Sequence, residues 1–476
     1  MQGVRVFEAT TSITRRFRKD NALNMYNNKI GSTSVFLVIA VASVFLIATT
    51  LIEMAGLAAG RSYGDAVFLM AGRSTLSEFD RRLLDDYGIL GMRGDENTIG
   101  DKLKYYSDAS LKRSSGILSG GVWKLPCDTR DIDVDLKGYS LLDINNFEKQ
   151  IFDDIKNILV NNLADTLIPV KNNKDDKTKS SENRKIRNKS VLGSLPSKGL
   201  STCILPIATI ISQGLPSLED LRDGVSSTFL TTEYALARFA AANTTIPKLA
   251  KGHDRFFSNE IEYLLIGKSD DNANYDEVIT RLSLLRFALN EFTLHTDKEM
   301  IIEVNSVTSI IVTAIPPGPW TPFIRELVIA AWCAIEAAND IKLLEGGEKV
   351  PLYKNSEDWA TSADSVISAV FTHISSGIEP GTMAGIEEQA ISDVKGKSAV
   401  KPEKSIGFAY IDYLRLFMYF TPRDAKLLRM MDLIQINMKI SYNSDFLIRE
   451  HYSGFRYQVV MNEDVYNYEQ KYRKDK

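Results

Sequence analysis

The sequence is poor in the residues on which catalytic and metal sites are usually built. It has three cysteines and four histidines among 476 residues. Three cysteines exclude a disulfide framework and a four-thiolate zinc site. The chain also lacks the CxxC, HExxH, GxxxxGK[ST] and GxSxG patterns of redox, zinc, phosphate-loop and nucleophile-elbow sites. We therefore expect no enzyme, no cofactor and no metal.

The remaining candidate ligands are scattered along the chain. No histidine has a second histidine within one helical turn, so a structural role is expected for each. The acidic stretch 269–274 lacks the spaced ligands, central glycine and terminal glutamate of a calcium loop. It predicts a polar turn before a helix that begins near Glu277. The histidines are His253, His295, His373 and His451.

Neither sign of charge is in excess. Lys and Arg number 57, Asp and Glu 61, and the formal net charge is −4. This balance excludes a nucleic-acid binder by composition. A hydrophobic content of 44% excludes disorder throughout the chain.

One long segment of the chain carries no charge at all. No charged residue occurs between Lys29 and Glu53, and 35–51 is almost entirely Val, Leu, Ile, Phe and Ala. A helix over 30–52 would be roughly 34 Å long, which is enough for a hydrocarbon core of about 30 Å. We predict a transmembrane helix with Lys29 and Glu53 at its boundaries and the lipid bilayer as its partner. A buried core helix is the alternative.

The flanking charges predict the orientation of this helix. Residues 1–29 hold six cations and two anions, and the first charge after the span is Glu53. Because Lys and Arg are retained inside, 1–29 is expected to be a cytoplasmic basic segment. The bulk of the chain would lie outside a single-pass anchor in the cell membrane. A cleaved signal peptide, cut near Ala58, is the competing interpretation.

The helix is expected to continue beyond the membrane over 53–88. Gly56, Gly60 and Gly64 recur every four residues and form one smooth stripe. Such a stripe lets a second helix approach closely. The second helix would belong either to a partner subunit or to this chain's own domain. Gly88 is a plausible end for the long helix.

The rest of the chain divides by composition. Residues 89–170 mix short apolar runs with turns and predict a mixed α/β region. Residues 171–199 hold nine cations and three anions with few large apolar side chains, which predicts a flexible basic linker. Residues 200–476 predict a mostly helical ectodomain with a strand at 455–460. The expected helices are Thr231–Ala242, capped by its Thr pair, Glu277–Phe292, Glu326–Leu344, Ile411–Phe420 and Ala425–Ile440.

The predicted fold class is therefore mainly α. One N-terminal transmembrane helix continues into a long amphipathic helix, and a mostly helical extracytoplasmic domain with a small β part follows.

Several stretches together resemble a known family. The chain resembles an uncharacterised family of Gram-positive membrane proteins, a domain of unknown function with a pilin-like or TadE-like N-terminal helix. Members are associated with Tad (Flp) pili or related secretion systems. The matching stretches are 31–57, 74–90, 260–271, 281–290, 326–354, 410–420 and 427–438.

The resemblance implies a non-enzymatic role. The chain would be a structural or accessory subunit, minor pilin-like or an assembly factor, that contacts other pilus or secretion subunits through its N-terminal helix. Pilin-like precursors are cut after a glycine and carry Glu at the fifth mature position. Here the fifth residue after Gly31 is Phe36, which departs from that pattern. The alternatives are a membrane-tethered protein that binds or cleaves wall polymer, and an independent surface receptor.

Overall fold

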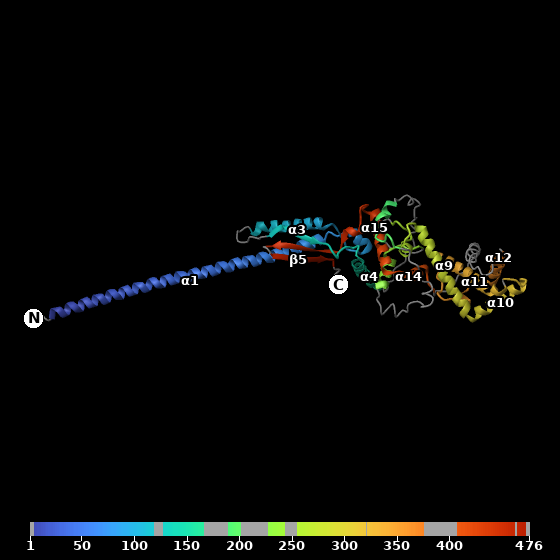
Figure 1. Ribbon diagram of the computed structural model, residues 1–476, viewed down its shortest axis with the longest axis horizontal. Helices are drawn as coiled ribbons and strands as arrows, with labels where there is room; N and C mark the ends of the chain where they lie inside the picture. Colours follow the sequence, from blue (N-terminus) through green and yellow to red (C-terminus); the bar gives the residue numbers. More distant parts are fainter. Residues whose placement is uncertain are drawn as a thin grey trace. The chain divides into compact units, whose positions relative to one another are not determined.

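The computed structural model is mainly helical with a small sheet part (Figure 1). Its contacts divide the chain into two compact units. Unit 1 combines residues 1–77, 96–135 and 456–470, and unit 2 combines 78–95, 136–455 and 471–476. The structure describes residues 4–118, 127–165, 189–200, 227–242, 255–319, 321–375, 407–461 and 464–472.

Unit 1 is built on one continuous helix, α1 (Val4–Leu76). No proline precedes Pro126, so nothing in this stretch removes a helical hydrogen bond. The hydroxyls of Ser43, Thr49 and Thr50 donate to carbonyls three or four residues back, which leaves few polar groups on its apolar part. The helix includes the basic segment 4–29, which the sequence analysis had not assigned to a helix.

The predicted continuation of this helix to residue 88 is wrong. α1 ends at Leu76, and a separate short helix, α2 (Arg81–Tyr87), follows. Asp80 interrupts the helix because its backbone is extended and its carboxylate accepts from the backbone N–H groups of Arg82 and Leu83, at 3.0 and 3.2 Å. Gly88 ends α2 in the left-handed region at φ 66°, as predicted for a helix stop.

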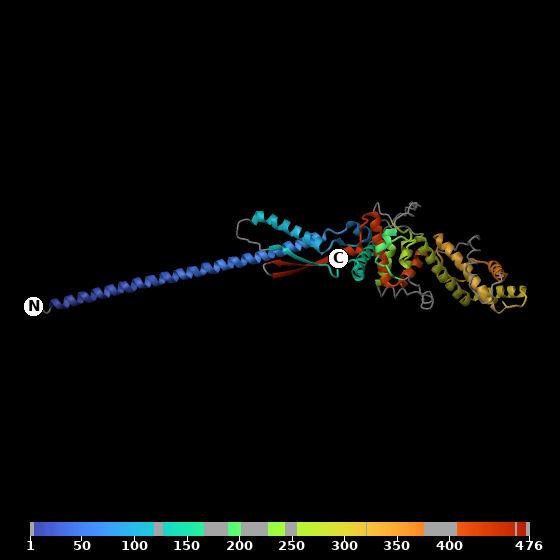
Figure 2. The same ribbon diagram turned by 45° about the horizontal axis from the view of Figure 1, so that its top comes forward.

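The end of α1 packs with a helix and a small sheet. The sheet has the strand order β2 (Cys127–Asp135), β4 (Gly454–Met461), β5 (Asp464–Lys471). β2 and β4 are antiparallel, with Asp133 opposite Gln458. Helix α3 (Glu96–Leu118) contacts both α1 and β2, and Figure 2 shows α3 and the strands beside the end of α1 from a second direction. The strand predicted at 455–460 is thus confirmed as β4.

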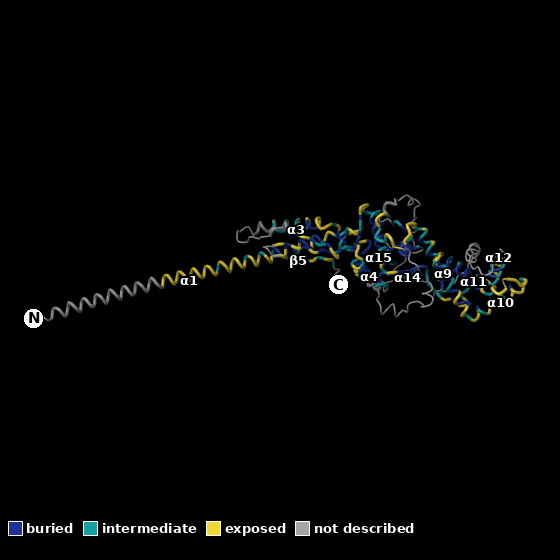
Figure 3. The backbone as a smooth tube through the Cα atoms, viewed as in Figure 1, coloured by how far each residue is buried: buried dark blue, intermediate teal, exposed yellow. Residues whose placement is uncertain are grey.

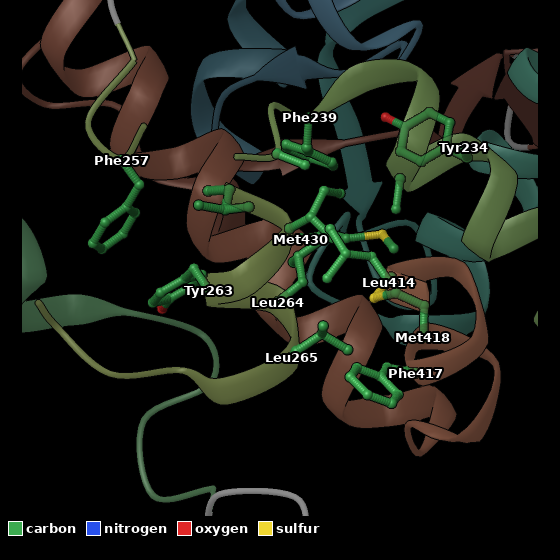
Figure 4. Close-up of a cluster of buried hydrophobic side chains, with 14 of the residues drawn as sticks. Tyr234, Phe239, Phe257, Tyr263, Leu264, Leu265, Leu414, Phe417, Met418 and Met430 are labelled. Carbon is green, nitrogen blue, oxygen red and sulfur yellow. The ribbon is translucent and has the colours of Figure 1, made fainter. Parts of the chain in front are cut away.

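Unit 2 contains two hydrophobic clusters. The larger is formed by residues of α4, α7, α8, α14 and α15, with part of α9, and Figure 4 shows its centre around Leu264, Leu414 and Met430. The smaller lies among α10, α11 and α12 around Trp332. Strand β1 (Met92–Arg93) pairs with β3 (His451–Tyr452). The helices are α4 (Ile144–Asp165), α7 (Ser227–Arg238), α8 (Glu260–Ile266), α9 (Asp271–Thr296), α10 (Lys298–Ala314), α11 (Ile324–Glu345), α12 (Ala363–Ser375), α14 (Tyr410–Phe420) and α15 (Arg423–Ser441).

Three local predictions in unit 2 need correction. The polar turn predicted at 269–274 is helical from Asp271 on, because α9 begins there with Asp270 as its N-cap. The Thr pair does not cap α7, because the helix begins at Ser227 and both hydroxyls donate to carbonyls four residues back. The predicted linker 171–199 is not unstructured at its end. Residues 189–194 form a 3₁₀ helix (η2), and Leu192 and Leu195 pack against the larger cluster. Residues 171–188 lie outside the described residues.

Candidate functional site

The described part of α1 carries an exposed apolar surface. Phe36 is 75% exposed, Phe45 68% and Met54 69%, far above what large apolar side chains show in a folded core. Figure 3 shows this part of α1 exposed and its last turns only partly buried. Within the described residues, the helix between Thr33 and Leu76 is the one long and apolar enough to cross a membrane. The predicted boundary residue Glu53 lies exposed on α1, and Lys29 lies on α1 where side chains are not described.

The predicted glycine stripe runs from the exposed part of α1 to the part that packs in the interior of unit 1. Gly56 and Gly60 are half-buried, whereas Gly64 is buried. α1 and α3 pack against one another in unit 1, and the Tyr63 hydroxyl donates to the Ser110 carbonyl at 3.5 Å. Gly64 therefore packs within the chain's own domain, and Gly56 and Gly60 lie closer to the exposed apolar surface.

A fourth glycine, Gly72, which was not among the predicted site residues, allows α1 to lie close to the sheet. A Cβ added at Gly72 would lie 2.5 Å from the Tyr457 hydroxyl and 2.8 Å from Gln470 Cγ. The Tyr457 hydroxyl donates to the Phe68 carbonyl at 2.7 Å, and the Tyr468 hydroxyl donates to Asp65 at 2.8 Å. The available signal was the spacing, since Gly72 follows Gly64 by eight residues on the same side of the helix.

Unit 2 contains a buried group of charges that spacing alone did not reveal. We call Arg286, Asn290, Glu336, Asp340 and Lys354 the core charge cluster. Each side chain is almost completely buried. α9 supplies Arg286 and Asn290, α11 supplies Glu336 and Asp340 one turn apart, and the segment after α11 supplies Lys354.

The core charge cluster pairs two cations with two anions. Arg286 donates from Nε to Asp340 at 2.9 Å, and Lys354 Nζ lies 2.5 Å from the other oxygen of Asp340. Lys354 also contacts Glu336. Because buried charges are costly unless paired, this neutral arrangement is the one that the interior tolerates.

Backbone contacts hold the cluster in place. Arg286 also donates to the carbonyls of Pro351 and Leu352, which fixes the segment that carries Lys354. Glu336 accepts from the backbone N–H groups of Ala360 and Thr361. The cluster therefore links α9, α11 and two loop segments.

Another buried acid, Glu262, lies on α8. Glu262 is fully buried and accepts from the Ala242 N–H and the Tyr410 hydroxyl, at 3.0 and 2.9 Å. Burial raises its pKa to about 7, although these hydrogen bonds act in the opposite direction. Its other oxygen, Oε2, has no hydrogen-bond partner within the described chain.

The three described histidines lie in different surroundings. His295 is exposed and His373 is buried. The buried His451 ring forms a hydrogen bond with the Leu447 carbonyl at 2.8 Å and packs against Phe446 with the two rings tilted, while His253 lies outside the described residues. Among the described residues, no group of three His, Cys, Asp or Glu side chains could hold a metal ion.

One comparison with known proteins gave a match. A family model, described as a family of unknown function (DUF5702), matches residues 144–463, two thirds of the chain. No curated protein and no solved structure matches this chain. The matched range does not include α1, so the exposed apolar surface has to be interpreted from its own residues.

Proposed function

The chain belongs to DUF5702, a family of unknown function, and from its own residues we propose that it is a membrane-anchored structural or accessory subunit of an extracytoplasmic assembly. The observation that carries this proposal is the exposed apolar surface of α1, which needs lipid or other helices to cover it. The basic segment before it favours a cytoplasmic N-terminus.

The assembly we propose is a Tad-type pilus or related secretion system of a Gram-positive cell. The resemblance of 31–57 to pilin-like and TadE-like helices is the reason for this choice. The way α1 is held supports it. Its last turns are fixed to the sheet by Tyr457 and Tyr468, whereas the preceding turns are exposed. A helix held at one end can pack laterally with partner helices while its domain stays outside.

Gly56 and Gly60 are the proposed contact points with a partner helix. Both are half-buried, and glycines at this spacing allow two backbones to approach closely. Gly64 is excluded from this role because unit 1 already buries it. The test is co-purification of membrane subunits with Gly56→Leu and Gly60→Leu.

We expect both substitutions to abolish co-purification, since a leucine would separate the two backbones. The matched control is Ala58→Leu, which adds the same side chain at an exposed position on another face of α1. Unchanged co-purification by the glycine variants would refute the contact. Equal loss by the control would show that the effect is not specific to the stripe.

A second candidate function rests on the outer face of the unit 1 sheet. This face has a hollow of about 570 Å³, lined in part by Asp133, Asp135, Arg456, Gln458 and Asn467. Side chains of this kind form multiple hydrogen bonds with polar polymers. A membrane-tethered protein that binds wall polymer would use such a surface. Binding of purified wall polymer, lost in Gln458→Ala, would favour this function.

A further inference from the structure

The core charge cluster places an amine against a carboxyl group in a site that excludes water. Lys354 Nζ lies 2.5 Å from Asp340 Oδ1 and also contacts Glu336. The side chain of Lys354 is 2% exposed, and those of the two acids are fully buried. Amines and carboxyl groups held in contact react far faster than the same groups free in solution.

The carboxyl group of Asp340 has hydrogen-bond donors placed as they would be around an acyl group during nucleophilic attack. Its Oδ2 accepts from Arg286 Nε at 2.9 Å and from Asn290 Nδ2 at 3.4 Å, so two donors face the oxygen on which negative charge would develop. Burial lowers the pKa of Arg286, but the charge of Asp340 outweighs this and raises it overall. Arg286 therefore stays positively charged.

Glu336 is placed to transfer protons. It contacts Lys354 Nζ, and the N–H groups of Ala360 and Thr361 fix its two oxygens at 3.3 and 3.0 Å. A buried carboxylate in contact with an ammonium can take its proton and later return it to a leaving group.

We propose that Lys354 and Asp340 become joined by an intramolecular amide bond. Glu336 takes one proton from the Lys354 ammonium, and the neutral amine attacks Asp340 Cγ. The Nζ–Cγ bond forms, and negative charge on Oδ2 is stabilised by Arg286. The Cγ–Oδ1 bond then breaks, and Oδ1 leaves as water with one proton from the amine and one from Glu336.

The reaction balances without an oxidant or cofactor. One ammonium and one carboxylate give one amide and one water. Glu336 takes up one proton and gives it back, so it is a carboxylate before and after the reaction. The net charge is also unchanged, because the reaction removes one cation, Lys354, and one anion, Asp340. Arg286 and Glu336 remain as one cation and one anion. The bond would close the chain between α11 and the segment at Lys354, including the turn at Gly347, whose φ is 83°.

The test is mass spectrometry of the full-length chain and its protease digest. We expect the Asp340 and Lys354 peptides to be found as one joined species, lighter than their sum by the mass of one water. Trypsin should not cleave after Lys354. Separate peptides at their full masses would overturn the proposal, and a bond to Glu336 would overturn the choice of Asp340.

Three variants make the test specific. Glu336→Gln keeps the shape but removes the proton acceptor, and we expect a folded chain with separate peptides. Lys354→Met removes the amine and should abolish the joined species. Lys349→Ala alters an exposed lysine of the same segment and should leave the bond intact. Joined peptides in Glu336→Gln would refute the role of Glu336.

Discussion

At the scale of single residues, Glu262 makes stability depend on pH. Burial raises its pKa from 4.5 to about 7, so the folded state holds this proton more tightly than the unfolded chain. The stabilisation is complete below pH 4.5 and is lost as the pH rises to about 7. With 1.36 kcal/mol for each pKa unit, the loss is about 3 kcal/mol.

We expect Glu262→Gln to flatten this part of the pH profile, because the amide does not titrate. The measurement is the urea midpoint of unfolding at a series of pH values between 4 and 8. Glu303→Gln, at an exposed position on α10, is the control and should leave the slope unchanged. The same slope in Glu262→Gln would assign the pH dependence to another group.

Gly72 gives the second prediction at this scale. Gly72→Ala places a Cβ against the Tyr457 hydroxyl and should destabilise unit 1 by about 1–3 kcal/mol through overpacking. Hydrogen exchange of the β4 amides measures this, since loosened packing lowers their protection. Ala66→Ser, at an exposed position on α1, should leave β4 protection unchanged.

Tyr457→Phe is expected to restore part of the lost protection in a double variant, because it removes the atom that meets the new Cβ. It also removes the hydrogen bond to the Phe68 carbonyl, so the rescue should be incomplete. Additive effects of the two substitutions would show that they do not act through this contact.

At the scale of elements, the break after α1 depends on one cap. Asp80→Ala removes the acceptor for the first N–H groups of α2 and should cost about 1 kcal/mol. The free energy of unfolding of unit 2, followed by the tyrosine signal, measures this loss. Asp80→Asn retains an N-cap acceptor and should cost less, whereas equal losses would contradict the capping role.

The same break shows where prediction from sequence succeeded and failed. Helices such as α11 and α15 were predicted well because their apolar positions follow the helical period over several turns. Leu76, Phe79 and Leu83 follow that period too, so the pattern ran through residues 77–80. The local hydrogen bonds of Asp80 outweighed this periodic pattern. Hydrophobic periodicity gives no information about such side-chain-to-backbone hydrogen bonds.

The candidate sites divide in the same way. The apolar surface of α1 was predictable because an uncharged run is visible in one stretch of sequence. The core charge cluster was not, since Arg286 and Lys354 are 68 positions apart in the chain and meet only through the packing of α9 on α11. An isolated lysine or arginine is usually exposed, so no single residue indicates burial.

At the scale of the whole molecule, the proposed anchoring predicts which residues face outward. Single cysteines at Thr11 and Ser309 would report on the basic segment and on the exposed face of α10. On intact cells, a membrane-impermeant maleimide should label Ser309→Cys and not Thr11→Cys. The unmodified chain gives the background, and the reverse labelling would contradict the proposed orientation.

Attachment to the bilayer is expected to resist alkaline carbonate, because a spanning helix is held by its apolar surface and not by charge. Membranes washed with carbonate should retain the full-length chain. Recovery in the supernatant would favour the cleaved signal peptide.

The hydrogen bond from Tyr457 to Phe68 joins residues 389 positions apart. At about 5–20 residues per second, synthesis of that interval takes roughly 20–80 seconds. During this time α1 is already made, while β4 and β5, whose Tyr457 and Tyr468 contact its last turns, do not yet exist. Unit 1 can therefore be completed only after residues 456–470 have been made. A prematurely terminated chain would expose the uncovered side of α1, a distinction that membrane proteases can use to remove incomplete chains.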